Sequence, residues 1–132
     1  MSNRTVVSAA AAIATLLLAG AAWAHHNMSA MFDFNDRVTL TGMLTKIDWR
    51  NPHIGLTVDV KGAGDETQSW RVEGPPPGFF RTRDVNKTNV DAALGKSVTF
   101  EASRARDGSQ SGLLRTMTLP DGAVLSACPQ NC

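Results

Sequence analysis

The sequence is short of the side chains that carry most enzyme chemistry. It contains no tyrosine, three histidines and two cysteines among its 132 residues. No Ser-His-Asp set, Cys-His pair or pair of carboxylates can be assembled from its motifs, so hydrolase chemistry has no positive support. We therefore rank a binding protein above an enzyme.

An excess of charge of one sign is also lacking. The sequence contains thirteen Lys and Arg residues and twelve Asp and Glu residues. Removal of Arg4 with a signal peptide would make the two numbers equal. A chain without net charge is a poor partner for nucleic acid, which attracts proteins through basic surfaces. We expect no nucleic acid among its ligands.

The only long apolar run lies at the N-terminus. Arg4 is followed by an uncharged segment at 6–22 and by Ala22-Trp23-Ala24, the small-x-small pattern of a signal peptidase site. This layout predicts a cleaved signal peptide at 1–24 and a periplasmic or secreted protein of 108 residues that begins with His25. An uncleaved anchor is the alternative, but the run is short for a membrane span, and we expect none after cleavage.

Beyond residue 36, apolar and polar residues alternate with the period of β-strands. The pattern predicts strands at 38–49, 54–60, 68–73, 97–103, 113–119 and 123–126. Gly42 and a change of phase near Thr45 indicate a bulge or strong bend in the first strand. The connection at 79–94 predicts one or two short helical turns, the second capped by Asn89 or Thr88.

Three strands, a short helical or irregular connection and two further strands are typical of a small OB-type barrel. We therefore expect an all-β, OB-like five-stranded barrel. A β-sandwich is the alternative, but it needs about seven strands. The expected organisation is a signal peptide at 1–24, an N-terminal segment at 25–36, the barrel at 37–126 and a tail at 127–132.

The three histidines fall in two places. His25 and His26 open the mature chain, and His53 follows the turn signal Asn51-Pro52. A free N-terminal amine and an imidazole both lose their protons near neutral pH, and together they chelate one metal ion. With His53 as a third nitrogen donor this is the histidine brace, which suits Cu(II). The alternative is a solvated N-terminus and a surface His53 that bonds to its own turn.

Neighbouring residues can complete or tune such a site. His26 either adds a third imidazole or takes no part. Met28 and Met31 are soft donors for Cu(I), although methionines more often fill gaps in a core. Asp33 either accepts a hydrogen bond from an imidazole N–H or belongs to a turn.

Cys128 and Cys132 form a Cys-x-x-x-Cys tail. In an exported protein two nearby cysteines usually pair, so we predict a small disulfide loop. A metal or redox site is the weaker interpretation, because redox motifs usually have two intervening residues.

Several segments together resemble one known family. They are His25-His26-Asn27-Met28, Trp49-Arg50-Asn51-Pro52-His53 and the stretches 38–42, 70–73, 105–109 and 118–122. The family consists of small exported bacterial proteins, classed as domain of unknown function 6152, and the resemblance covers the mature chain except its tail. It implies export and an OB-like β-barrel, and it implies no established activity.

These observations lead to one functional hypothesis and two alternatives. The leading hypothesis is a periplasmic protein that binds a metal, with copper as the favoured ion, through His25 and His53 and delivers it to a periplasmic or membrane partner. The first alternative is an interaction module without a metal. A copper oxidase or oxygenase ranks last, because such an enzyme needs an aromatic substrate surface, and this chain has no tyrosine.

Overall fold

The structure is a computed structural model that describes residues 28–128. Met28–Met31 form a helical turn that belongs to a first unit, and the second unit begins at Phe32. Its strands are β1 (Phe32–Asp48), β2 (Gly55–Lys61), β3 (Thr67–Glu73), β4 (Ser97–Ala105), β5 (Ser111–Thr118) and β6 (Val124–Ser126). The 3-10 helix η1 (Pro77–Phe80) and the helix α2 (Lys87–Ala92) lie between β3 and β4. The second unit is therefore all-β apart from one short connection, as the alternation predicts.

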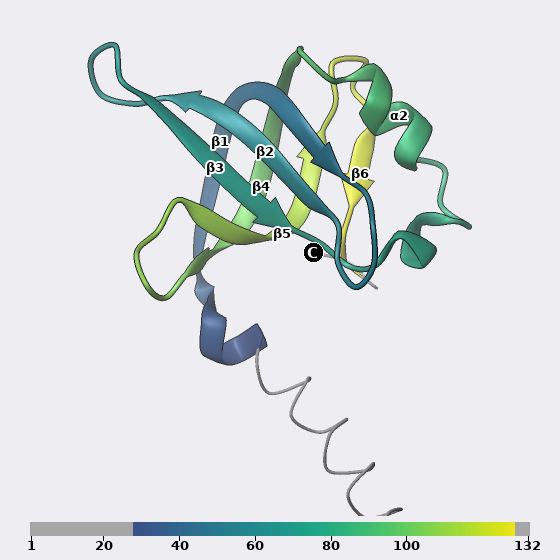
Figure 1. The fold of residues 1–132 in the computed structure, drawn as a ribbon, viewed down its shortest axis with the longest axis horizontal. Helices are drawn as coiled ribbons and strands as arrows, with labels where there is room; N and C mark the ends of the chain where they lie inside the picture. The colour runs from purple at the N-terminus through teal and green to yellow at the C-terminus, as the bar shows by residue number, and fades with distance from the viewer. Residues whose placement is uncertain (1–27, 129–132) are drawn as a thin grey trace, which may run out of the picture. The chain divides into compact units, whose positions relative to one another are not determined.

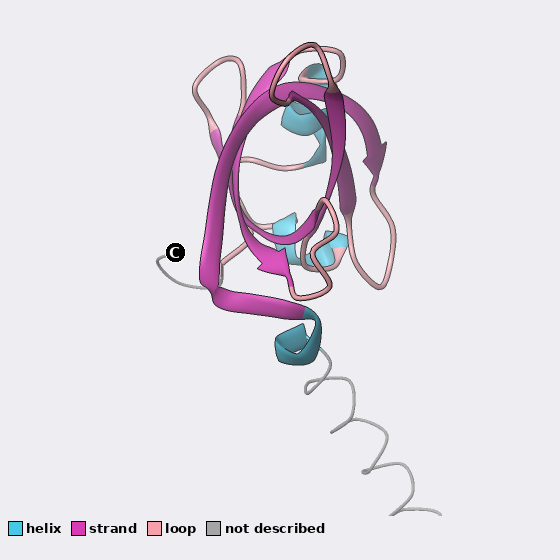
Figure 2. Cartoon of the chain, turned by 90° about the vertical axis from the view of Figure 1, so that its left-hand side faces the viewer, coloured by secondary structure: helices cyan, strands magenta, loops and turns pink. Residues whose placement is uncertain are grey.

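The six strands form one sheet in the order β3-β2-β1-β4-β5-β6 (Figure 1). All neighbours in this order are antiparallel. A further, parallel ladder joins β3 to β5 through Arg71–Ser111, Val72–Gly112 and Glu73–Leu113. The pairings of β1, β2, β3, β5 and β4 thus form a closed ring, which Figure 2 shows end-on.

The inward faces of these strands supply the core. In β2, Leu56 and Val58 are fully buried, and between them Thr57 lies on the other, half-exposed face. Trp70 of β3 and Phe100 of β4 meet inside the ring, with ring centroids 6.0 Å apart. Trp70 is therefore a buried core aromatic. Successive side chains of a strand point to opposite faces, and for this reason the alternation of apolar and polar residues in the sequence located the strands.

Strand β1 has the irregularity that the sequence predicts. Its register with β2 shifts between Leu44 and Lys46, where the apolar phase changes. At Gly42 a Cβ atom would lie 2.3 Å from the carbonyl oxygen of Asp59, so glycine permits the close approach of β2. The strand starts at the lower end of the sheet in Figure 1, bends at the top and turns downward, and the loop that follows it reaches the lower end again.

Two details differ from the prediction. Strand β1 begins at Phe32, which pairs with Ala105 of β4, rather than near Arg37. The cap of α2 is Asn86, not Asn89 or Thr88: the Asn86 side chain accepts from the Thr88 backbone N–H, and Asn89 accepts from the Asn86 N–H. Two asparagines three residues apart form a reciprocal cap, and the helix starts at Lys87.

Candidate metal-binding site

The loop between β1 and β2 carries His53 and is anchored at both of its ends. Trp49 packs on the buried Phe80 of η1, with ring centroids 5.0 Å apart. At the other end Ile54 is fully buried and exchanges backbone hydrogen bonds with the chain that follows β3, from Ile54 N to Pro75 O and from Gly74 N to Ile54 O. These two anchors place His53 beside the end of β3.

The His53 side chain meets a carboxylate there. Its Nδ1 atom lies 2.5 Å from Oε1 of Glu73, and the side chains are 37% and 26% exposed. Glu73 is the register partner of Gly55, so the β2–β3 ladder brings the carboxylate beside the histidine. With Nδ1 bound to Glu73, the Nε2 atom is the one left to bind a further ligand.

The other predicted site residues lie in the N-terminal part of the chain. His25 and His26 are outside the residues that the structure describes. Met28 is half-buried and Met31 is 45% exposed in the N-terminal helical turn, so Met31 does not fill a core. Among residues 28–128 no group of three or more His, Cys, Asp or Glu side chains could hold a metal ion.

Asp33 has a partner other than His53. Its carboxylate accepts a hydrogen bond from the backbone N–H of Asn35 and forms an ion pair with Arg106, 3.1 Å away. The two interactions are those of a local turn and of a bridge from β1 to the residue directly after β4. Asp36 makes a similar, longer contact of 3.6 Å with Arg104. These bridges hold the first residues of β1 on β4, and the carboxylate that contacts His53 is Glu73 instead.

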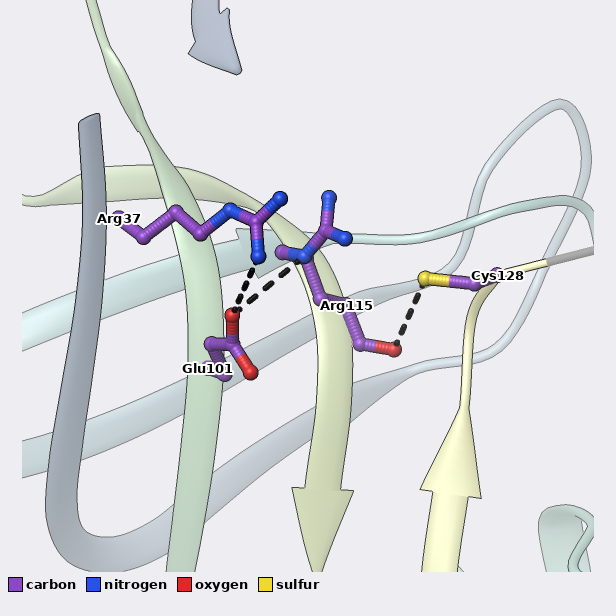
Figure 3. Close-up of polar contacts among 4 residues, drawn as sticks. All are labelled: Arg37, Glu101, Arg115 and Cys128. Atoms are coloured by element: carbon purple, nitrogen blue, oxygen red, sulfur yellow. Dashed lines mark hydrogen bonds and ion pairs between the residues drawn. The ribbon is translucent and has the colours of Figure 1, made fainter. Parts of the chain in front are cut away.

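The tail begins beside a charged group on the outer face of the sheet. Glu101 of β4 lies 3.5 Å from both Arg37 of β1 and Arg115 of β5, and the Arg115 carbonyl oxygen lies 3.8 Å from Sγ of Cys128 (Figure 3). A second arginine, Arg83, donates to the Cys128 carbonyl oxygen. Cys132 lies outside the described residues, so the disulfide between Cys128 and Cys132 stays a prediction.

Sequence reasoning did not identify Glu73 as a partner of His53. A usable signal was present in the turn Gly62-Ala63-Gly64-Asp65. A hairpin centred on Gly64 pairs Gly55 with Glu73, which is the observed register. Because opposite residues in a ladder share a face, that register already places Glu73 near His53.

The ring of strands, with a histidine and a glutamate at one end, defines a small all-β protein with a candidate ligand site on the β1–β2 loop. The chain matches a family of unknown function, DUF6152, over residues 12–115, and it belongs to that family. No curated protein and no solved structure matches it. Among the described residues no helix is both long and apolar enough to span a membrane.

Proposed function

We propose that the exported protein binds one copper ion through the mature N-terminus and His53. The amine and ring of His25 provide two nitrogen donors, Nε2 of His53 provides the third, and His26 is a further donor or a bystander. The single observation that carries the proposal is the contact between Nδ1 of His53 and Glu73. Histidines that bind metals almost always donate their second ring nitrogen to a carboxylate, a carbonyl or a water.

The Glu73 contact has two chemical consequences for His53. A carboxylate that accepts from Nδ1–H fixes the tautomer in which the lone pair is on Nε2, and it orients the ring. The anchored loop also fixes the ring near one position, which lowers the entropy lost when a metal binds. A histidine that only covered a surface would gain little from either effect.

The course of β1 supports the participation of the N-terminus. The start of β1 and the loop after it lie at the same end of the sheet. A series of neighbouring ladder pairs connects them: Phe32–Ala105, Arg104–Gly112, Gly112–Val72 and Val72–Leu56. His25 precedes Phe32 by seven residues, which span up to about 23 Å when extended and less where Met28–Met31 are helical. A segment of this length can lead back toward the loop.

We further propose that the closed ring is an OB-type barrel and that the protein resides in the periplasm or outside the cell. In barrels of this type the loop after the first strand is a common place for ligands, and His53 lies on that loop. Copper delivery to a periplasmic or membrane partner is the role that fits a small site on a neutral, exported protein.

The decisive experiment combines intact mass with copper titration. Protein recovered from the periplasm should begin at His25 and bind one Cu(II) ion, with Zn(II) bound more weakly in accordance with the Irving–Williams order. His53→Ala should remove one nitrogen and most of the affinity, and an extra alanine before His25 should remove the chelate. Met43→Ala, an exposed position on β1, is the control and should bind as the wild type does.

Two results would overturn the proposal. One is a mature protein that starts elsewhere than at His25, because the amine would then be an amide. The other is undiminished copper binding by the extended protein. In either case an interaction module without a metal becomes the better description.

A further inference from the structure

Strand β6 lies at the end of the sheet and is paired on one side only. It follows β5 in the strand order, and no other strand of residues 28–128 pairs with it. Its register with β5 runs without a shift from Thr118–Val124 to Thr116–Ser126. The free side of such a strand presents backbone N–H and C=O groups to whatever lies beside it.

The hydrogen bonds around β6 show which of its backbone groups face outward. Two bonds flank the β5–β6 ladder, from Leu119 N to Ala123 O and from Ala127 N to Arg115 O. Because bonded and non-bonded pairs alternate in an antiparallel ladder, Leu125 is bonded to β5, and the backbone groups of Val124 and Ser126 point away from it. These outward groups have no hydrogen-bond partner in the part of the chain that the structure describes.

A cavity of about 400 Å³ borders this free edge. Its walls come from β6 and from the segment between η1 and α2, namely Thr82, Arg83, Asp84, Val85, Val124 and Ser126. The Val124 side chain is 46% exposed and gives the cavity an apolar wall. Arg83 is held by the Phe79 ring and the Cys128 carbonyl oxygen. Asp84 is exposed and has no ion pair or hydrogen bond with any described side chain, so its charge is not neutralised there.

We infer that β6 is a docking edge for an extended segment of a partner protein, which adds to the sheet as a further strand and carries a Lys or Arg side chain for Asp84. The outward N–H and C=O groups of Val124 and Ser126 bond to the backbone of the added strand, as in other cases of strand addition. Alternate side chains of that strand point to one face, so one of them enters the cavity, where Asp84 favours a positive charge. A second copy of β6, which contains only Val124, Leu125 and Ser126, lacks such a charge.

The test is an NMR titration of the isotope-labelled protein with the peptide acetyl-TVKVT-amide. The backbone amide signals of Val124 and Ser126 should shift saturably, and their hydrogen exchange should slow. Asp84→Asn should bind this peptide about threefold more weakly, as expected for the loss of one exposed ion pair. Asp65→Asn in the exposed β2–β3 turn is the matched control and should bind as the wild type does. The peptide acetyl-TVEVT-amide should bind more weakly than the lysine peptide, because its glutamate is repelled by Asp84.

A second variant tests the backbone of the edge. Ser126→Pro removes an outward N–H without removing a bond to β5, and proline is tolerated at such edge positions. It should bind the lysine peptide about tenfold more weakly, whereas Ser126→Ala keeps the N–H and should bind as the wild type does. If the proline variant does not fold, the lysine peptide N-methylated at its valine and lysine residues tests the same bonds on the wild type and should not bind.

Three results would refute the inference. One is the absence of a saturable shift at Val124 and Ser126 in the wild type. Another is an unchanged affinity when either side of the backbone pairing is blocked, by Ser126→Pro or by N-methylation of the peptide. The third is a shift of the same two amides when the concentration of the protein alone is raised, which would assign the edge to a second copy of this chain instead of a basic partner.

Discussion

Nδ1 of His53 and Oε1 of Glu73 lie 2.5 Å apart, although twenty residues separate them in the chain. The β2–β3 ladder brings them together, and the contact leaves Nε2 as the outward ring nitrogen. The first prediction therefore concerns Glu73, which supports the proposed metal donor without binding the metal itself.

Glu73→Ala should lower the copper affinity of the mature protein by about 10- to 100-fold, the usual effect of removing a partner behind a metal-bound histidine. Glu73→Gln should fall between this variant and the wild type, because an amide oxygen still accepts from Nδ1–H. Copper titration measures both. Glu66→Ala in the exposed β2–β3 turn removes the same charge away from His53 and should leave the affinity unchanged, whereas an equal loss in this control would attribute the effect to net charge.

Much of the fold can be predicted from the local alternation of apolar and polar residues, whereas most of the site cannot. Strands β2 and β3 were predicted to within one residue because each has one buried and one outer face. The start of β1 was predicted too late because residues 33–36 are mainly polar and do not alternate. Ion pairs of Asp33 and Asp36 with arginines at the end of β4 and directly after it hold this part of the strand. Such bridges depend on the partner strand, which a single segment does not reveal.

The candidate site also depends partly on local sequence signals and partly on contacts between residues far apart in the sequence. The turn signal Asn51-Pro52 correctly placed His53 on a loop between two strands. The contact of His53 with Glu73 depends on the register of a hairpin. Register is a property of paired strands rather than of one strand, so composition and periodicity alone do not identify this contact.

Gly42→Ala should destabilise the protein by about 1–3 kcal/mol, the usual cost of forcing extra volume into a packed place. The new Cβ would lie 2.3 Å from the carbonyl oxygen of Asp59, and backbone cannot move aside as a side chain can. Urea unfolding measures the change. Gly78→Ala in η1 is the control, because a Cβ there has no neighbour within 4 Å. Equal stability of the two variants would contradict the close approach of β1 and β2.

Phe100→Ala should be among the most destabilising changes in the core, by about 3–5 kcal/mol. The side chain is fully buried and packs against Trp70, so its removal leaves a cavity that the closed ring of strands cannot readily collapse. Equilibrium unfolding in urea checks this value. Met43→Ala on the exposed face of β1 should change stability by less than about 0.5 kcal/mol, and a similar loss in both variants would show that burial does not set the cost.

The turn between β4 and β5 should titrate abnormally at acid pH. The side-chain hydroxyl of Ser109, 2.7 Å from Oδ1 of Asp107, and then its backbone N–H, at 2.9 Å, hold the pKa of Asp107 below the ordinary value of 3.8. Because the folded pKa is the lower one, the stability that this turn gains is present above pH 3.8 and is lost as the pH falls through the folded pKa. The carboxyl is fully exposed, so solvent keeps the effect small.

Ser109→Ala removes the larger of these two interactions and should raise the pKa of Asp107 toward its ordinary value, while the backbone N–H keeps part of the effect. An NMR titration of the Asp107 carboxyl carbon measures the shift directly. Ser69→Ala is the matched control: its hydroxyl donates to Asp59, a different carboxylate, at 2.6 Å, so the titration of Asp107 should not change. An Asp107 that titrates at its ordinary pKa in the wild type, or equally in wild type and Ser109→Ala, would show that the hydroxyl does not hold this turn in solution.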